Sequence, residues 1–172
     1  MRSRNSILLV VFLVACTLLG GCSSLNVKHL SPKPWQPDTP NRLALKFWTV
    51  DYSCVRDGNR FVITGTARPK TERFPAWSTW MSELVITAYL SDASGRVLTQ
   101  ETFRQAPGPF PPPGTDIPLK FTMTTAKPVE TPAITFGYRM ILLADQPSMN
   151  RKNPLKARNA QVFFASQEAL RQ

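Results

Sequence analysis

The stretch ELVITAYLSDASGRVLTQETF, residues 83–103, decides the fold because it has the pattern of a complete β-hairpin. In its first half, side chains alternate between two faces of a strand, and one face is purely apolar. The DASG tetrapeptide then supplies turn residues, and residues 97–103 form the returning strand. The predicted inward residues are Leu84, Ile86, Ala88 and Leu90, while Val85, Thr87 and Tyr89 lie on the opposite face.

The same period of two appears upstream, in RLALKFWTVDYSCV at residues 42–55. Its apolar phase shifts after Phe47, so this segment is either one strand with a β-bulge or two short strands. Asp57 and Gly58 form a strong hairpin signal that leads into FVITGTAR, where Gly65 predicts a bend or a close backbone approach. The predicted inward residues of FVITGTAR are Phe61, Ile63 and Ala67.

Three further segments complete an all-β pattern: IPLKFTMTT, AITFGYRMILLAD and the short AQVFFA. Amphipathic helices between the strands, which a parallel α/β fold needs, do not appear. The pattern predicts a single antiparallel, immunoglobulin-like β-sandwich over residues 42–166, followed by a C-terminal tail over residues 167–172. The inward residues of the two longer segments are Leu119, Phe121 and Met123, then Ile134, Phe136, Tyr138, Met140 and Leu142.

The N-terminal residues 1–21 have the pattern of a signal peptide. Arg2 and Arg4 form a positive start, and an uninterrupted apolar run follows at residues 7–19. This run is short for a membrane-spanning helix, which needs about 20 residues. It ends in LGGC, residues 19–22, and not in the A-x-A-like site of ordinary signal peptides.

This LGGC tetrapeptide resembles the lipobox of bacterial lipoprotein precursors. The resemblance implies that a peptidase cuts between Gly21 and Cys22, and that Cys22 carries a diacylglyceryl group and a further acyl chain such as palmitate. Ser23 stands where an aspartate would retain such a protein, which implies sorting to the outer membrane with the domain facing the periplasm. The alternatives are an uncleaved anchor helix and an ordinary signal peptide with a chance cysteine.

Residues 22–41 are predicted to form a lipid-anchored flexible tether. The segment SPKPWQPDTP contains four prolines and no apolar period, so we expect an extended, semi-rigid chain that holds the domain off the bilayer. For Trp35 we predict packing against the domain, with a position at the lipid interface as the alternative.

A second resemblance covers residues 61–125. The order of FVITGTA, LVITAYLSDASGRVL and IPLKFTM is similar to that of FxLYD and related immunoglobulin-like envelope sandwiches, although the F-x-L-Y-D peptide itself is absent. The resemblance implies a structural or interaction module, and fold analogy alone does not assign an activity.

The chemical inventory predicts a protein that is not an enzyme and has no metal or cofactor besides the lipid on Cys22. The only histidine, His29, falls in the predicted tether, so a triad with a histidine held in the fold is not expected. The acidic residues are scattered over predicted turns and strand ends, and the sequence contains no phosphate-loop or dinucleotide fingerprint. Cys54 is predicted to be a buried, inert thiol, with intermolecular pairing as the alternative.

Two insertions are candidate contact surfaces. RFPAWSTWMSE places Phe74, Trp77 and Trp80 between two strands, either as an aromatic ledge for a ligand or as a flap that covers an open end of the sandwich. PGPFPPPG, residues 107–114, is either a polyproline segment offered to a partner or a stiff crossover between sheets.

Charge provides a third candidate surface. The chain has 21 Lys and Arg against 11 Asp and Glu, and it stays basic after the loss of Arg2 and Arg4. An anionic partner, such as lipid headgroups, peptidoglycan or an acidic protein, is one interpretation of this charge, and a solvated loop is the other. Nucleic acid is not an expected partner of a lipid-anchored exported protein. The basic residues cluster at Arg151, Lys152, Lys156 and Arg158.

Together these patterns predict a lipid-anchored cell-envelope protein with a non-catalytic structural or protein-interaction role. The alternative is a periplasmic lipoprotein that binds a glycan or small ligand through the aromatic insertion, and an envelope hydrolase is the least favoured class.

Overall fold

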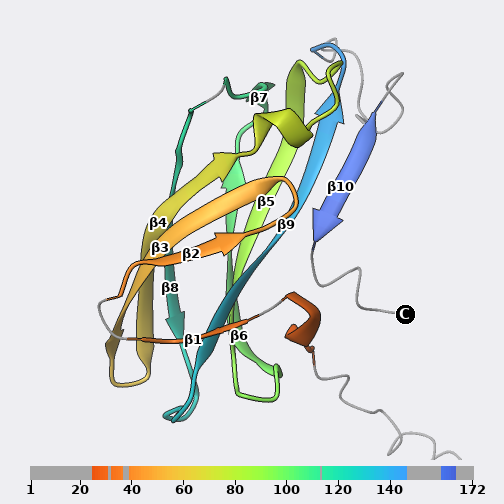
Figure 1. Cartoon of the computed structure of the whole chain (residues 1–172). Coiled ribbons are helices and arrows are strands. Elements are labelled where there is room, and N and C mark those ends of the chain that lie inside the picture. The colour runs from red at the N-terminus through yellow and green to blue at the C-terminus, as the bar shows by residue number, and fades with distance from the viewer. Residues whose placement is uncertain (1–24, 31, 37–38, 113, 147–159, 166–172) are drawn as a thin grey trace, which may run out of the picture.

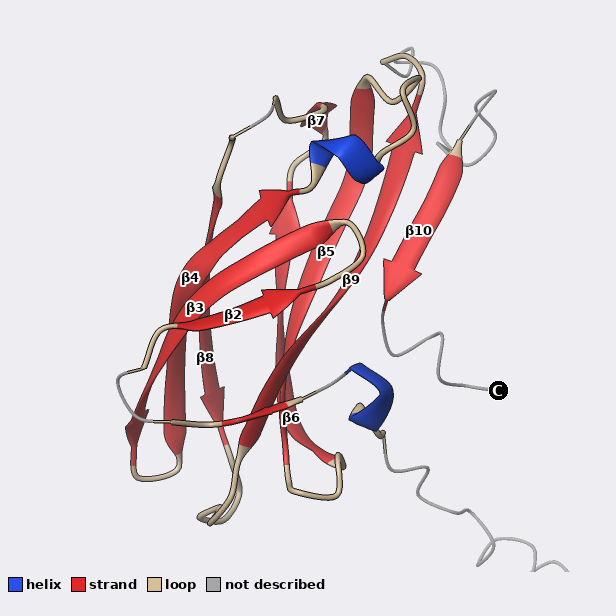
Figure 2. Cartoon of the chain, viewed as in Figure 1, coloured by secondary structure: helices blue, strands red, loops and turns tan. Residues whose placement is uncertain are grey.

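A computed structural model describes residues 25–30, 32–36, 39–112, 114–146 and 160–165. Within them the chain is a β-sandwich of two antiparallel sheets, which confirms the predicted all-β fold (Figures 1 and 2). Helix in these described ranges is limited to two single 3-10 turns, η1 (Lys28–Leu30) and η2 (Thr71–Arg73). The strands are β1 (Lys33–Pro34), β2 (Asn41–Ala44), β3 (Trp48–Asp57), β4 (Arg60–Pro69), β5 (Trp80–Ser91), β6 (Val97–Gln105), β7 (Gly108–Pro109), β8 (Ile117–Thr124), β9 (Ala133–Leu143) and β10 (Gln161–Ala165).

The four-stranded sheet has the order β2-β3-β4-β8, and the six-stranded sheet has the order β1-β9-β5-β6. In the six-stranded sheet, β10 also pairs with β9 and β7 also pairs with β5. Among the described strands, the chain crosses between the sheets after β1, after β4, after β7 and after β8. With β3, β4 and β8 in one sheet and β10, β9, β5 and β6 in the other, the strand order is that of an immunoglobulin-type sandwich.

Both predicted hairpins are present. Strand β5 pairs with β6 from Leu84↔Gln105 to Ser91↔Val97, so the stretch at residues 83–103 forms the hairpin that ends the β1-β9-β5-β6 order of its sheet. At the β3–β4 turn, Gly58 has a φ of 59°, a left-handed conformation that glycine adopts without a steric penalty. The phase shift at residues 42–55 marks two strands rather than a bulge, because β2 and β3 form their own tight hairpin.

The core lies between the sheets and consists of the residues that alternation placed inward. Leu84, Phe61 and Phe136 are each 0% exposed, and their partners on β8 and β3 are nearly as buried. Gly65 is a point of close approach, as predicted, because a Cβ atom there would lie 2.2 Å from the carbonyl oxygen of Asp51. Any side chain at Gly65 therefore requires β3 and β4 to move apart.

The predicted boundary near Arg42 is corrected by the structure, because residues of the predicted tether already belong to the sandwich. Val27 is 0% exposed and donates a backbone hydrogen bond to Gly95, and β1 pairs with β9 at Lys33↔Ile134. Trp35 packs against the core, as predicted, and its indole N–H donates to the carbonyl of Cys54 at 3.2 Å. The sequence did not reveal this docking because single apolar residues among prolines show no period.

The two ends of the sandwich are built differently (Figure 1). What we call the lower end carries the β3–β4 turn, the β5–β6 turn, the β8–β9 connection and the first described residues. The upper end carries the β4–β5 connection, residues 70–79, and the β6–β8 connection, which contains β7. Among the described residues, none forms a helix that is long and apolar enough to cross a membrane.

Candidate functional site

The upper end brings together the two insertions that the sequence singled out. Strand β7 pairs with the start of β5 at Trp80↔Pro109, and the backbone N–H of Phe110 donates to the carbonyl of Thr79 at 2.9 Å. The rings of Phe74 and Phe110 then meet at a centroid distance of 4.6 Å and an angle of 60°. The aromatic insertion and the proline-rich segment therefore form one surface, which we call the upper-end surface.

Phe74 joins this surface to the core. Its ring lies 5.1 Å from the Phe47 ring and 6.0 Å from the fully buried Trp48 ring, measured between centroids. Lys70 holds the start of the insertion, because its backbone N–H donates to the carbonyl of Phe47 at 2.9 Å and its ammonium donates to that of Leu45 at 2.7 Å. The insertion is thus a packed extension of the sandwich.

A small hollow of about 290 Å³, open to solvent, lies on the upper-end surface where the two insertions meet. Its walls are mainly aromatic and proline side chains, and its polar groups are threonine and serine hydroxyls. This size is at the lower limit for a small-molecule site, so it suits a few side chains of a partner better than an enclosed ligand. The lining residues are Thr71, Phe74, Pro75, Ala76, Ser78, Thr79, Phe110, Pro111 and Pro112.

Three buried polar atoms near this end lack a hydrogen-bond partner within the part of the chain that the structure describes. They are the indole nitrogens of Trp48 and Trp80 and the hydroxyl oxygen of Ser78. Ser78 also lines the hollow. Buried polar groups are normally satisfied, and an unsatisfied one costs about 1–3 kcal/mol. Hydrogen bonds to these three atoms would therefore stabilise the upper end.

The three predicted aromatic contact residues have different positions. Phe74 and Trp77 are half-buried and pack against the core. Their packing favours the interpretation of this insertion as a flap that covers the end of the sandwich. Trp80 belongs to β5, pairs with Leu143 and is half-buried. Of these three residues, only Phe74 lines the hollow described above.

Sequence reasoning missed the role of Phe110 at this site. It treated PGPFPPPG as a separate feature, and the signal available was a lone aromatic residue inside a run of prolines. The remaining predicted contact residues, Arg151, Lys152, Lys156 and Arg158, lie outside the described residues, as do Gly21 and Cys22.

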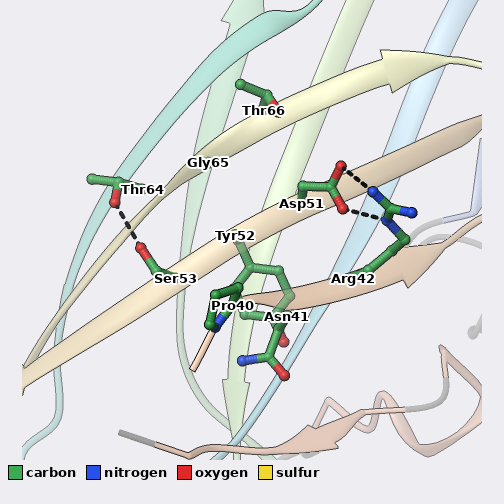
Figure 3. A pocket seen from close by; sticks show the side chains of 9 residues that line it. All are labelled: Pro40, Asn41, Arg42, Asp51, Tyr52, Ser53, Thr64, Gly65 and Thr66. Carbon is green, nitrogen blue, oxygen red and sulfur yellow. Dashed lines mark hydrogen bonds and ion pairs between the residues drawn. The ribbon is translucent and has the colours of Figure 1, made fainter. Parts of the chain in front are cut away.

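A second hollow, shallow and of about 750 Å³, lies over the outer face of the four-stranded sheet (Figure 3). Here the Arg42 guanidinium donates two hydrogen bonds to Asp51, at 2.6 and 3.2 Å, and the hydroxyls of Ser53 and Thr64 lie 3.2 Å apart. The bond from Arg42 keeps the pKa of Asp51 below its usual value. The hollow is therefore a polar strand face with its charges already paired.

Three other carboxylates, those of Asp116, Glu83 and Asp92, are also paired with arginines. Arg68 donates two hydrogen bonds to Asp116, both at 2.8 Å, and Arg139 bonds to Glu83. Asp92 lies in the β5–β6 turn, where hydrogen bonds from Ser94 and then Arg96 lower its pKa. A general acid needs the opposite, a raised carboxyl pKa.

The thiol of Cys54 is not activated as a nucleophile. Cys54 is 2% exposed, as predicted, and burial raises the pKa of its thiol to about 11. Such a thiol is almost entirely protonated at neutral pH and is a poor nucleophile. His, Cys, Asp and Glu residues form no cluster of three or more suited to a metal ion among the described residues.

Comparisons with protein-family models, with curated proteins and with solved structures found no match to this chain.

Proposed function

We propose that this chain is a lipid-anchored, non-catalytic interaction module of the cell envelope, and that its upper-end surface docks on a protein partner. The observation that carries the proposal is the joining of two distant segments, residues 70–79 and 106–112, into one aromatic and proline-rich surface. Prolines and packed aromatic rings lose little conformational entropy on binding, which favours such a surface for docking.

The hollow itself supports the same surface. A partner segment that enters the hollow can cover the half-buried Phe110 ring and the neighbouring prolines. The paired carboxylates and the high pKa of Cys54 support a role without catalysis.

The anchor part of the proposal is tested at Cys22. In cells fed labelled palmitate, Cys22→Ala should abolish the label and leave an uncleaved precursor or a protein released from membranes. Cys16→Ala is the matched control, because Cys16 lies within the segment that cleavage would remove, and it should leave the label unchanged. Persistent label in Cys22→Ala would refute the lipoprotein assignment.

The docking part is tested by site-specific photocrosslinking in intact cells. A photoreactive residue at Ala76 or Pro112, both exposed at the upper end, should trap one discrete protein. The same residue at Thr64, exposed on the four-stranded sheet, is the control and should trap none.

Phe110→Ala should weaken the crosslink from Ala76, because it removes one wall of the hollow without touching the anchor. Equal crosslinking from Thr64 would contradict a specific upper-end surface. A failure to trap protein, combined with glycan binding by the purified chain, would favour the glycan-receptor alternative.

A further inference from the structure

The first described residues are fastened to the lower end by a set of hydrogen bonds. The carbonyl of Leu25 accepts from the backbone N–H of Val97, and the N–H of Val27 donates to the carbonyl of Gly95, both at 2.9 Å. Asn26 donates through its side-chain amide to the carbonyl of Ser94 at 3.3 Å. The chain is therefore fixed to the β5–β6 turn from Leu25 onward.

This attachment continues through η1. Asn26 accepts the backbone N–H of Lys28 at 2.8 Å, which closes the turn before the helix. The hydroxyl of Thr135, on the outer face of β9, donates to the carbonyl of Leu30 at 2.9 Å. The Val27 side chain of this segment is fully buried. Detaching the segment would therefore expose an apolar side chain and break several hydrogen bonds.

Chain length then limits where the lower end can lie. Cys22 precedes Leu25 by three residues, and three residues span at most about 11 Å in any conformation. The headgroup region of one leaflet is about 5–8 Å thick, from the difference between the full bilayer and its hydrocarbon core. A lipid on Cys22 would hold Leu25 within or just above the headgroups, with no room for a spacer.

The charge of the lower end suits such a position. Its turns and first residues carry more basic than acidic side chains, and Lys28, Arg60 and Lys127 are exposed. Asp92 is already paired with Arg96 at 3.1 Å. Basic side chains near a bilayer are attracted to anionic headgroups. The basic residues are Lys28, Arg56, Arg60, Arg96 and Lys127, and the acidic ones are Asp57, Asp92 and Glu130.

We infer that the lower end is a membrane-contact surface, which holds the sandwich directly on the headgroups of the bilayer and turns the upper end away from it. The inference rests on the proposed lipidation of Cys22. It replaces the predicted flexible tether over residues 22–41 with a short connection that gives the sandwich a fixed orientation on the membrane. Strand β5 has 12 residues, so the upper end would lie about 35 Å above the headgroups.

The test uses the full chain, processed in cells, purified with its lipid and reconstituted in vesicles of phosphatidylethanolamine and phosphatidylglycerol. A fluorophore is placed on a single cysteine at Ala93→Cys or Ala126→Cys at the lower end, or at Ala76→Cys at the upper end, in a Cys54→Ala background. All three alanines are exposed loop residues, so they form a matched set. A spin label on the lipid headgroup serves as the quencher.

We expect several-fold stronger quenching at Ala93 and Ala126 than at Ala76. Inserting a long Gly/Ser linker between Ser24 and Leu25 should reduce the lower-end quenching, because the domain can then leave the surface. Circular dichroism of each variant verifies that the sandwich is folded.

The outcomes separate the two proposals. Vesicle-bound, palmitate-labelled protein with equal or greater quenching at Ala76 would overturn the orientation and leave the anchor intact. Quenching that is unchanged by the linker would also overturn it, since the short connection would then not set the position. Protein that carries no lipid and stays off the vesicles would overturn both proposals.

Discussion

The upper and lower ends of this sandwich both close the core between the two sheets, but they do so by different means. At the upper end, two long connections cover the core with aromatic rings, and three buried polar atoms have no partner among the described residues. At the lower end, short turns and residues 25–30 are joined by backbone and side-chain hydrogen bonds. The comparison shows that hydrogen bonds to residues 25–30 close the lower end, whereas packed aromatic rings close the upper end and leave polar atoms without a partner among the described residues.

The largest expected effect concerns the aromatic closure of the upper end. Phe74→Ala removes a ring that contacts Phe47, Trp48 and Phe110, so we expect a loss of about 2–4 kcal/mol in the free energy of unfolding. Phe110→Ala, at the outer side of the same cluster, should cost about half as much, because Phe110 has fewer ring contacts. Urea denaturation of both variants measures the difference, and equal losses would contradict a cluster anchored through Phe74.

A smaller effect is expected from two glycines of the lower end, both with positive φ. Gly95→Ala combines a φ of 84° with a Cβ only 3.0 Å from Asn26 and Lys28, whereas Gly58→Ala, at φ 59°, has no atom within 4 Å of the new Cβ. We expect about 1 kcal/mol for Gly58→Ala from backbone strain alone, and a greater loss for Gly95→Ala.

Hydrogen exchange at the Val27 amide separates the two glycine variants. Exchange should accelerate in Gly95→Ala and stay unchanged in Gly58→Ala, because only Gly95 contacts the N-terminal segment. Equal acceleration in both variants would mean that the segment is not fixed by this contact.

The smallest effect is the pH dependence of the lower end. Hydrogen bonds from Ser94 and Arg96 lower the pKa of Asp92 in the folded state, so the carboxylate stabilises the turn above its unfolded pKa of about 3.9. This contribution, less than about 1 kcal/mol for an exposed pair, is lost as the pH falls through the lowered folded pKa.

Urea midpoints between pH 6 and pH 2 test this dependence, with Asp92→Asn as the reference. The variant should lack this part of the acid destabilisation, whereas a midpoint that falls equally in both proteins would show that Asp92 contributes nothing.

The alternation of apolar and polar residues in the sequence was sufficient to predict the central strands. The period of two placed Leu84, Phe61 and Phe121 inward, and the turn residues around Gly58 and Gly95 located two hairpins, because these features depend on neighbours close in the chain. The same local pattern could not choose between a bulge and two strands at residues 42–55, since both alternatives shift the apolar phase in the same way.

The sequence by itself determined an all-β protein with an inward apolar face, because side-chain alternation is a local property of an extended backbone. Only the tertiary structure decided that Phe110 meets Phe74, that residues 25–30 and 32–35 pack against the sandwich, and that these two features lie at opposite ends. Each of these contacts joins segments that are far apart in the chain and that crossovers between the sheets bring together. The hydrophobic period of the sequence does not indicate which loops will meet in this way. The surfaces proposed for docking and for the membrane therefore follow from topology, and the strands that support them follow from the sequence.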